Sequence, residues 1–90
     1  MSRFLFKVID TFWLETIGLV VATDVRTGAV SLRVGEAIEL RRPDGSRLKT
    51  EVAAIPRLRP HNPDRPFDFL LPKGVGKGDV PVGTEVWASQ

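Results

Sequence analysis

The chain has 90 residues, of which 42% are hydrophobic, and a formal net charge of +2 at pH 7. A chain of this length is expected to form one domain, spanning 1–90, because it is too short to bury two cores. It has no cysteine, which excludes a disulfide framework and a thiolate metal site. Seven prolines and eight glycines are typical of many short strands joined by turns.

The N-terminal third predicts two strands. Alternating side chains from Phe4 onward indicate the first strand, and the β-branched run at 16–22 indicates the second. Phe12, Trp13 and Leu14 lie between them, and we expect these side chains to pack in the core or at its end. An exposed Trp13 would instead be a ready contact residue for a partner.

The middle of the chain has the clearest β pattern. Apolar and polar residues alternate over 30–34, which predicts a strand that follows a left-handed Gly28. A turn at Gly35 leads to another strand at 38–41. The Arg-Pro-Asp-Gly sequence at 42–45 then predicts a hairpin, because proline presets φ and glycine fits a left-handed turn position.

Three more strands are predicted at 47–55, 67–71 and 84–88, separated by a proline-rich loop at 57–66 and a glycine-rich loop at 73–79. No helix of two turns is expected. The fold class is therefore all-β, a small closed or nearly closed antiparallel β-barrel of about six strands. Its expected core consists of Phe6, Val8, Leu19, Val21, Val30, Leu32, Ile38, Leu40, Val52, Phe69 and Val86.

Positive charge is concentrated in the second half of the chain. Nine bases and four acids lie between residues 41 and 77, whereas the remainder has four bases and seven acids. This asymmetry favours an anionic partner, although the ordinary charge variation of a solvated surface gives similar counts. A secondary basic patch is expected from Arg41, Arg42 and Arg47.

The proline-rich loop is the main candidate for a partner-binding site. Its arginines are suited to phosphate or carboxylate, and its prolines reduce the entropy lost on binding. Arginine beside an aromatic ring is typical of proteins that bind single-stranded RNA and of hot spots in protein–protein interfaces. A third interpretation is a solvated loop that binds no partner. The candidate partner-binding residues are Arg57, Arg59, His61, Arg65 and Phe67.

The sequence favours no enzyme activity, no metal and no cofactor. His61 is the only histidine, and no nucleophile motif or acidic cluster with metal-ligand spacing is present. No Ser or Thr follows Lys77 in the glycine-rich loop, and Val80-Pro81 stands where a helix would be needed, so we expect no nucleotide binding. No apolar run reaches the roughly 20 residues of a membrane span, and we expect a cytoplasmic protein.

The order of these elements resembles the second domain, a β-barrel, of translation elongation factors of the Tu type. The matching pieces, FLFKVIDTF, IGLVVATDV, RTGAVSLRVGEAIEL and KGVGKGDVPVGTEVWA, cover nearly the whole chain. The resemblance implies a barrel that contacts RNA or the ribosome. The family's aminoacyl-tRNA contact patterns are not kept in AAIPRLRP and DRPFDFLL, so no tRNA-contact residue is carried over.

Two functions are open from the sequence. The first is a stand-alone, translation-factor-like binding module for RNA or the ribosome. The second is a protein–protein interaction module, such as a small regulatory, accessory or immunity-type protein. Salt dependence separates them, because phosphate contacts make the affinity for RNA fall steeply as salt rises.

Overall fold

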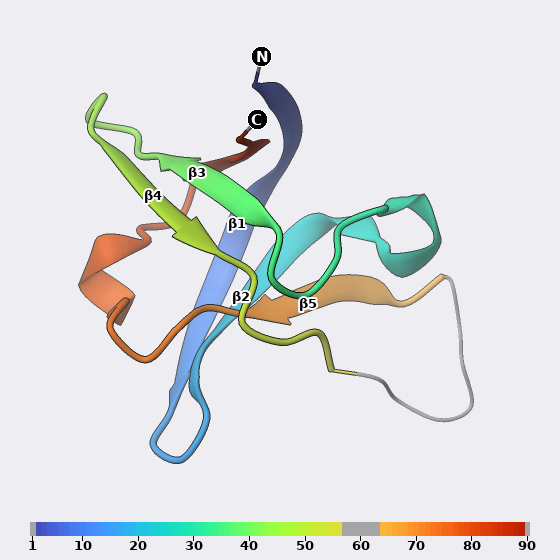
Figure 1. Cartoon of the computed structure of the whole chain (residues 1–90), viewed down its shortest axis with the longest axis horizontal. Helices are drawn as coiled ribbons and strands as arrows, with labels where there is room; N and C mark the ends of the chain where they lie inside the picture. Colours follow the sequence, from blue (N-terminus) through green and yellow to red (C-terminus); the bar gives the residue numbers. More distant parts are fainter. Residues whose placement is uncertain (1, 57–63, 90) are drawn as a thin grey trace.

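The computed structural model describes residues 2–56 and 64–89, and six strands follow one another along this part of the chain (Figure 1). Short 3₁₀ turns, η1 (Thr27–Ala29) and η2 (Lys77–Asp79), interrupt them, and the described residues contain no α-helix. The strands are β1 (Arg3–Leu14), β2 (Gly18–Arg26), β3 (Ala37–Arg41), β4 (Arg47–Glu51), β5 (Pro66–Leu70) and β6 (Glu85–Ala88).

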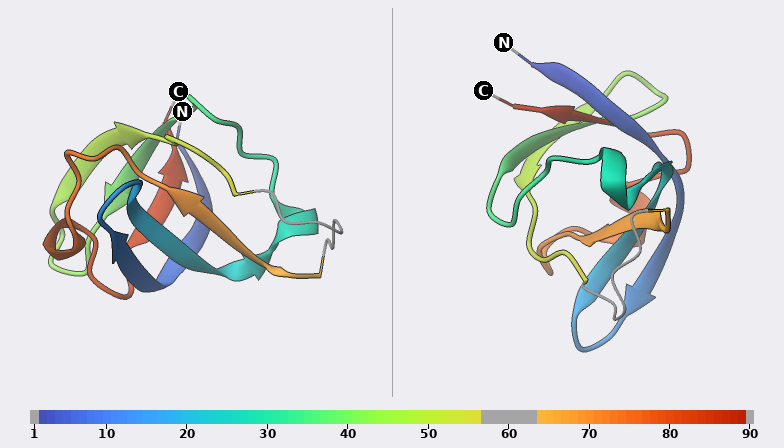
Figure 2. Two further views of the ribbon diagram at one scale, coloured as in Figure 1. Left: turned by 90° about the horizontal axis from the view of Figure 1, so that it is seen from below. Right: turned by 90° about the vertical axis from the view of Figure 1, so that its right-hand side faces the viewer.

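All six strands belong to one antiparallel sheet with the order β4-β3-β6-β1-β2-β5. The long strand β1 lies inside the sheet, pairing with β6 through residues 3–7 and with β2 through residues 8–14. Figure 2 shows that the sheet is strongly curled, so that one of its faces is concave. The prediction of an all-β fold with about six antiparallel strands is confirmed.

The edge strands β4 and β5 do not form a ladder with each other, so the sheet is not a closed barrel. The chain that follows β4 contacts β5 through an isolated bridge between Ala54 and Leu70. The Leu70 amide donates a 2.8 Å hydrogen bond to the Ala54 carbonyl, and the Ala53 amide donates a 2.8 Å hydrogen bond to the Leu70 carbonyl. These bonds are the point of closest association between the two edges.

The apolar core lies on the concave face of the sheet. Side chains alternate across a strand, so alternate residues of β2, β3, β5, β6 and the first half of β1 point into this core. Val30 is only partly buried, but the other predicted core residues are buried. These are Phe6, Val8, Leu19, Val21, Leu32, Ile38, Leu40, Val52, Phe69 and Val86.

The strand predicted at 30–34 is not formed. The preceding Gly28 lies in η1 and does not have a positive φ, so that expectation was also wrong. Residues 30–34 connect β2 to β3 across the concave face, where the Leu32 side chain is buried although its backbone joins no strand. Of the three alternating apolar residues, Leu32 is buried, Val30 is partly buried and Val34 is exposed, so the pattern here predicted burial only in part.

The two turns around β3 agree with the sequence. Gly35 has φ of 86° and donates a 2.7 Å hydrogen bond to the Val52 carbonyl. Gly45 has φ of 92° and closes the β3–β4 hairpin, donating a 3.0 Å hydrogen bond to the Arg42 carbonyl. Both positions favour glycine because a Cβ atom is disfavoured at positive φ.

Truncation of a core side chain in β3 tests this packing. Leu40 has no exposed surface, so Leu40→Ala should lower the free energy of unfolding by about 2–5 kcal/mol. Val82 is 63% exposed, and Val82→Ala is the matched control that should stay within about 0.5 kcal/mol of the wild type. Urea denaturation of the three proteins measures both values, and equal stability of all three would contradict the core assignment.

Candidate binding surfaces

The predicted loop site is only partly within the described residues. Arg57, Arg59 and His61 lie outside them. Arg65 is exposed, and its carbonyl accepts hydrogen bonds from the Thr27 amide at 2.8 Å and the Thr27 hydroxyl at 3.0 Å. The backbone of Arg65 therefore connects the start of β5 to η1, while its side chain belongs to the surface.

The prediction that Phe67 offers a stacking face was wrong. Its side chain is only 3% exposed, because the alternation of β5 directs both Phe67 and Phe69 into the core. The two rings stack at 5.9 Å, and the ring of Phe6 lies 5.7 Å from each of them. Between them, Asp68 points outward, and partial burial raises the pKa of its carboxyl while Arg65 acts in the opposite direction.

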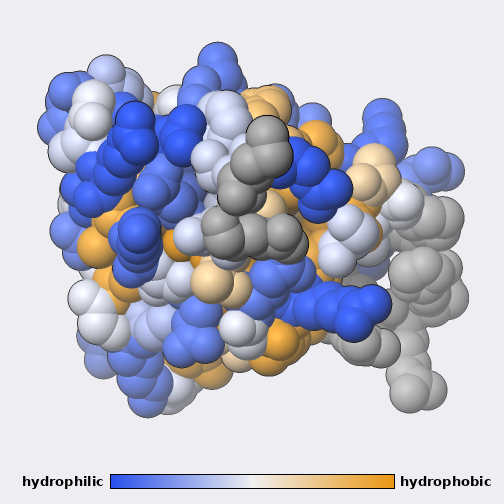
Figure 3. Space-filling view, turned by 45° about the horizontal axis from the view of Figure 1, so that its top comes forward, coloured by the Kyte–Doolittle hydropathy of each residue, from blue (hydrophilic) through white to orange (hydrophobic). Residues whose placement is uncertain are grey.

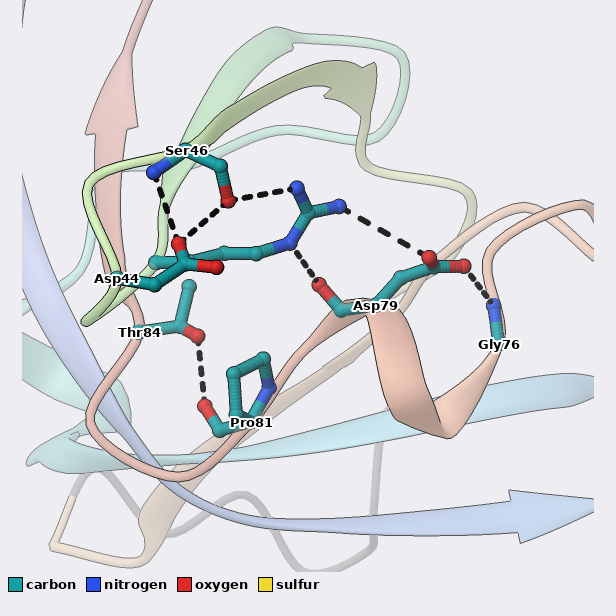
Figure 4. A network of polar contacts seen from close by, with 7 residues as sticks. Asp44, Ser46, Gly76, Asp79, Pro81 and Thr84 are labelled. Carbon is teal, nitrogen blue, oxygen red and sulfur yellow. Dashed lines mark hydrogen bonds and ion pairs between the residues drawn. The ribbon is translucent and has the colours of Figure 1, made fainter.

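Arg42, one of the three residues of the secondary basic patch, is held by intramolecular contacts (Figure 4). Its Nε donates a 2.7 Å hydrogen bond to the Asp79 carbonyl, and its Nη1 donates one of 3.1 Å to the Ser46 hydroxyl. The Asp79 carboxylate in turn accepts a 2.9 Å hydrogen bond from the Gly76 amide. Arg42 thus connects the β3–β4 hairpin to η2.

Arg41 and Arg47 lie opposite each other on β3 and β4. Arg41 donates a 2.6 Å hydrogen bond to Glu39, and its guanidinium lies 4.0 Å from the centre of the Trp87 ring. Arg47 is mostly exposed and lies 3.8 Å from the same carboxylate of Glu39. The hydrogen bond from Arg41 is the main cause that lowers the pKa of Glu39.

The outer face of β3 and β4 therefore carries mixed charge. Lys49 is exposed beside Glu39 and Glu51, and the ring of Phe4 packs edge-on against Trp87 at 5.5 Å. In Figure 3, charged and polar side chains cover most of the left-hand part of the molecule, where these strands lie. Acids and bases alternate closely here, so the surface is not a concentrated positive patch.

Four of the eight exposed large apolar side chains in the described part of the chain lie together at the end of the β1–β2 hairpin. Each member is 44–50% exposed, and we call this group the apolar tip. The expectation that residues 12–14 pack in the core or at its end was therefore wrong, and the alternative of an exposed Trp13 holds. The apolar tip consists of Phe12, Trp13, Leu14 and Ile17.

The hairpin is exposed because it extends past the strands beside it (Figure 1). β1 pairs with β6 only through residues 3–7, and β2 pairs with β5 from residue 20 onward, so 12–18 form a two-stranded ribbon. Side chains alternate along a strand, which puts Trp13 on one face of the ribbon and Phe12 and Leu14 on the other. The sequence feature that indicated apolar side chains on both faces of the hairpin was a run of large apolar residues without alternation.

A hollow of about 560 Å³ lies beside the apolar tip. The turn of the hairpin forms one wall, and the segments that follow β4 and β5 form the others. Only Thr16 and Lys73 among its lining residues are polar. The apolar lining residues are Ile17, Ala53, Ala54, Ile55, Pro56, Leu70, Leu71 and Pro72.

Gly18 fixes how closely the hairpin approaches this hollow. It has φ of 106°, and a Cβ atom placed on it would lie 3.3 Å from the carbonyl oxygen of Leu71. The Leu71 amide also donates a 3.0 Å hydrogen bond to the Leu19 carbonyl. Glycine at this position therefore allows the base of the tip to lie directly against the wall of the hollow.

The comparisons with known proteins give no assignment: no protein-family model, curated protein or solved structure matches the chain significantly. Within 2–56 and 64–89, no three His, Cys, Asp or Glu side chains gather where they could hold a metal ion. The same residues include no helix long and apolar enough to cross a membrane.

Two arginine variants distinguish the structural arginine from the exposed one. Arg42→Ala should lower the free energy of unfolding by about 1–3 kcal/mol, because it removes hydrogen bonds from a charged group that is largely buried. Arg47→Ala is the matched control, with an expected change of about 0–1 kcal/mol because its ion pair is exposed. Thermal or urea unfolding measures the difference, and equal effects would contradict the assigned roles.

Proposed function

We propose that this chain is a non-catalytic binding module that docks on a protein partner through the apolar tip. The observation that supports this is the gathering of four large apolar side chains on one projecting hairpin. Scattered exposed apolar residues are normal on soluble proteins, but a contiguous group commonly marks an interaction site. Trp is also among the residues that dominate the energetics of protein interfaces.

A partner that covers the hairpin would also stabilise it. A two-stranded ribbon is only marginally stable in water when no third strand or opposing layer packs on it. A partner that covers both faces would bury the exposed half of Trp13 on one side and of Phe12 on the other, each contributing about 1–1.5 kcal/mol. Docking would therefore stabilise the ribbon as well as the complex.

RNA binding is the second candidate function, and one observation favours it. The exposed cations Arg47 and Lys49 lie on the same sheet face as Phe4 and Trp87, and cations beside aromatic rings suit single-stranded RNA. The resemblance to the second domain of translation elongation factors supports the same function. The acids interleaved on this face and the internal contacts of Arg41 weigh against it.

We also propose that the curled sheet behaves as the nearly closed barrel that this resemblance implies. The support is the pair of hydrogen bonds that joins Ala53 and Ala54 to Leu70. The amides of Ala53 and Leu70 should then exchange with deuterium much more slowly than that of Val34, which lies outside every strand. Amide exchange followed by NMR measures this, and exchange at both positions as fast as at Val34 would mean that the edges separate freely.

Site-specific photo-crosslinking tests the docking proposal. Phe12 is replaced by benzoylphenylalanine, and the purified protein is irradiated in a lysate of the source cells with and without nuclease. We expect a protein adduct that survives nuclease treatment, because the partner covers the tip. The matched control carries the same group at the exposed Lys49 and should give little adduct.

The same experiment separates the two candidate functions. Adducts formed only from position 49, and lost after nuclease treatment, would favour RNA and contradict docking through the tip. An adduct with one defined protein from position 12 supports docking, including an adduct with a second copy of this chain, whereas adducts with many unrelated proteins contradict it. Circular dichroism of both labelled proteins verifies that the substitutions leave the sheet intact.

A further inference from the structure

We infer that the partner of the apolar tip is a second copy of this chain, so that the protein forms a two-fold symmetric dimer. This inference rests on the proposed docking role of the tip and names its occupant. In the dimer, the tip of each copy enters the hollow of the other. Three features of the structure support this arrangement: shape, symmetry and charge.

The first feature is that a projection and a fitting hollow lie side by side. Phe12, Trp13 and Leu14 project on the hairpin, and Ile17, at its turn, also forms part of the wall of the hollow. The hollow of about 560 Å³ falls within the range of cavities that hold small organic molecules. Its apolar lining suits the ring of Phe12, which has no hydrogen-bonding group and loses no hydrogen bond on entering it.

The second feature is the symmetry that this placement allows. A surface on which a projection lies beside its complement can meet a second copy of itself across a two-fold axis, so that each copy makes the same contact with the other. Each copy then fills the hollow of the other, and the assembly closes at two copies without leaving an unfilled site. The hairpin is free to reach across, because it extends beyond its neighbours in the sheet (Figure 2).

The third feature is charge complementarity across the same surface. Glu15 lies in the turn of the hairpin and Lys73 lines the hollow, and neither forms an ion pair within the described part of the chain. A two-fold axis that brings a tip to the opposite hollow also brings Glu15 of one copy to Lys73 of the other. The dimer would therefore contain this attractive pair twice.

The area available for a dimer is modest. The four half-exposed side chains of the tip offer roughly 400 Å², taking about 150–250 Å² for a large side chain in full. The walls of the hollow add only a little to this area. The total stays below the roughly 600–800 Å² per partner of standard interfaces, which is typical of a weak, concentration-dependent association.

Sedimentation equilibrium of the purified protein tests the inference. We expect the mass to rise with concentration from the 10.0 kDa of the single chain to twice that value. Trp13→Ser should weaken the dimer by at least about tenfold, the change that corresponds to a loss of 1.4 kcal/mol. Val34→Ser is the matched control, because Val34 is exposed and belongs neither to the tip nor to the lining of the hollow, and it should leave the dimer unchanged.

A pair of charge-reversal variants tests the same interface if Trp13→Ser does not fold. Glu15→Lys and Lys73→Glu should each weaken the dimer, because each places like charges across the two-fold axis. The double variant restores both attractive pairs and should recover the affinity of the wild type. Lys73 also lies beside the hairpin of its own chain, so the two single variants are mixed as well. Each contact of the mixed dimer then joins opposite charges, and a recovery of affinity on mixing requires contact between copies.

Several results would overturn the inference and are distinguishable from failure of the docking proposal. A protein that stays monomeric, while position 12 crosslinks to a different protein, refutes the dimer and leaves docking through the tip intact. A monomer with no protein adduct at position 12 refutes both. A dimer that is insensitive to Trp13→Ser and to both charge reversals refutes the assigned interface.

Discussion

The structure depends on one constraint: a single sheet, with no helix among the described residues to cover it, must bury its apolar face against itself. Strands two places apart in a flat sheet are about 10 Å apart. The ring of Phe6 on β1 nevertheless lies 5.7 Å from those of Phe67 and Phe69 on β5, two places away. The sheet curls to allow this contact. The curl also leaves a concave face that segments outside the strands must cover.

The same curl explains where the surface remains apolar. Segments outside the strands cover the concave face, with Leu32 from the β2–β3 connection and Val52 from the chain after β4 both buried. The hairpin at 12–18 extends beyond the curled part, so nothing within the described chain covers it. The proposed docking through the apolar tip is based on this distribution of burial. Arg42 connects the other hairpin, β3–β4, to η2.

Sequence patterns that depend on short-range physics were reliable. Period-two alternation identified Ile38 and Leu40 on β3 as core residues, and both have no exposed surface. The turns at Gly35 and Gly45 were predicted because positive φ is a local demand on the backbone. The all-β class and ten of the eleven predicted core residues came from such patterns.

The sequence alone determined which residues seek burial and where the chain turns, because alternation and φ are local properties. Only the tertiary structure decided which other residues each of these side chains contacts. It placed Phe67 in the core, bound Arg42 to Asp79, 37 residues away, and left 30–34 unpaired over the concave face. It also left Trp13 exposed, because the length of a hairpin relative to strands distant in sequence is not encoded in any local pattern.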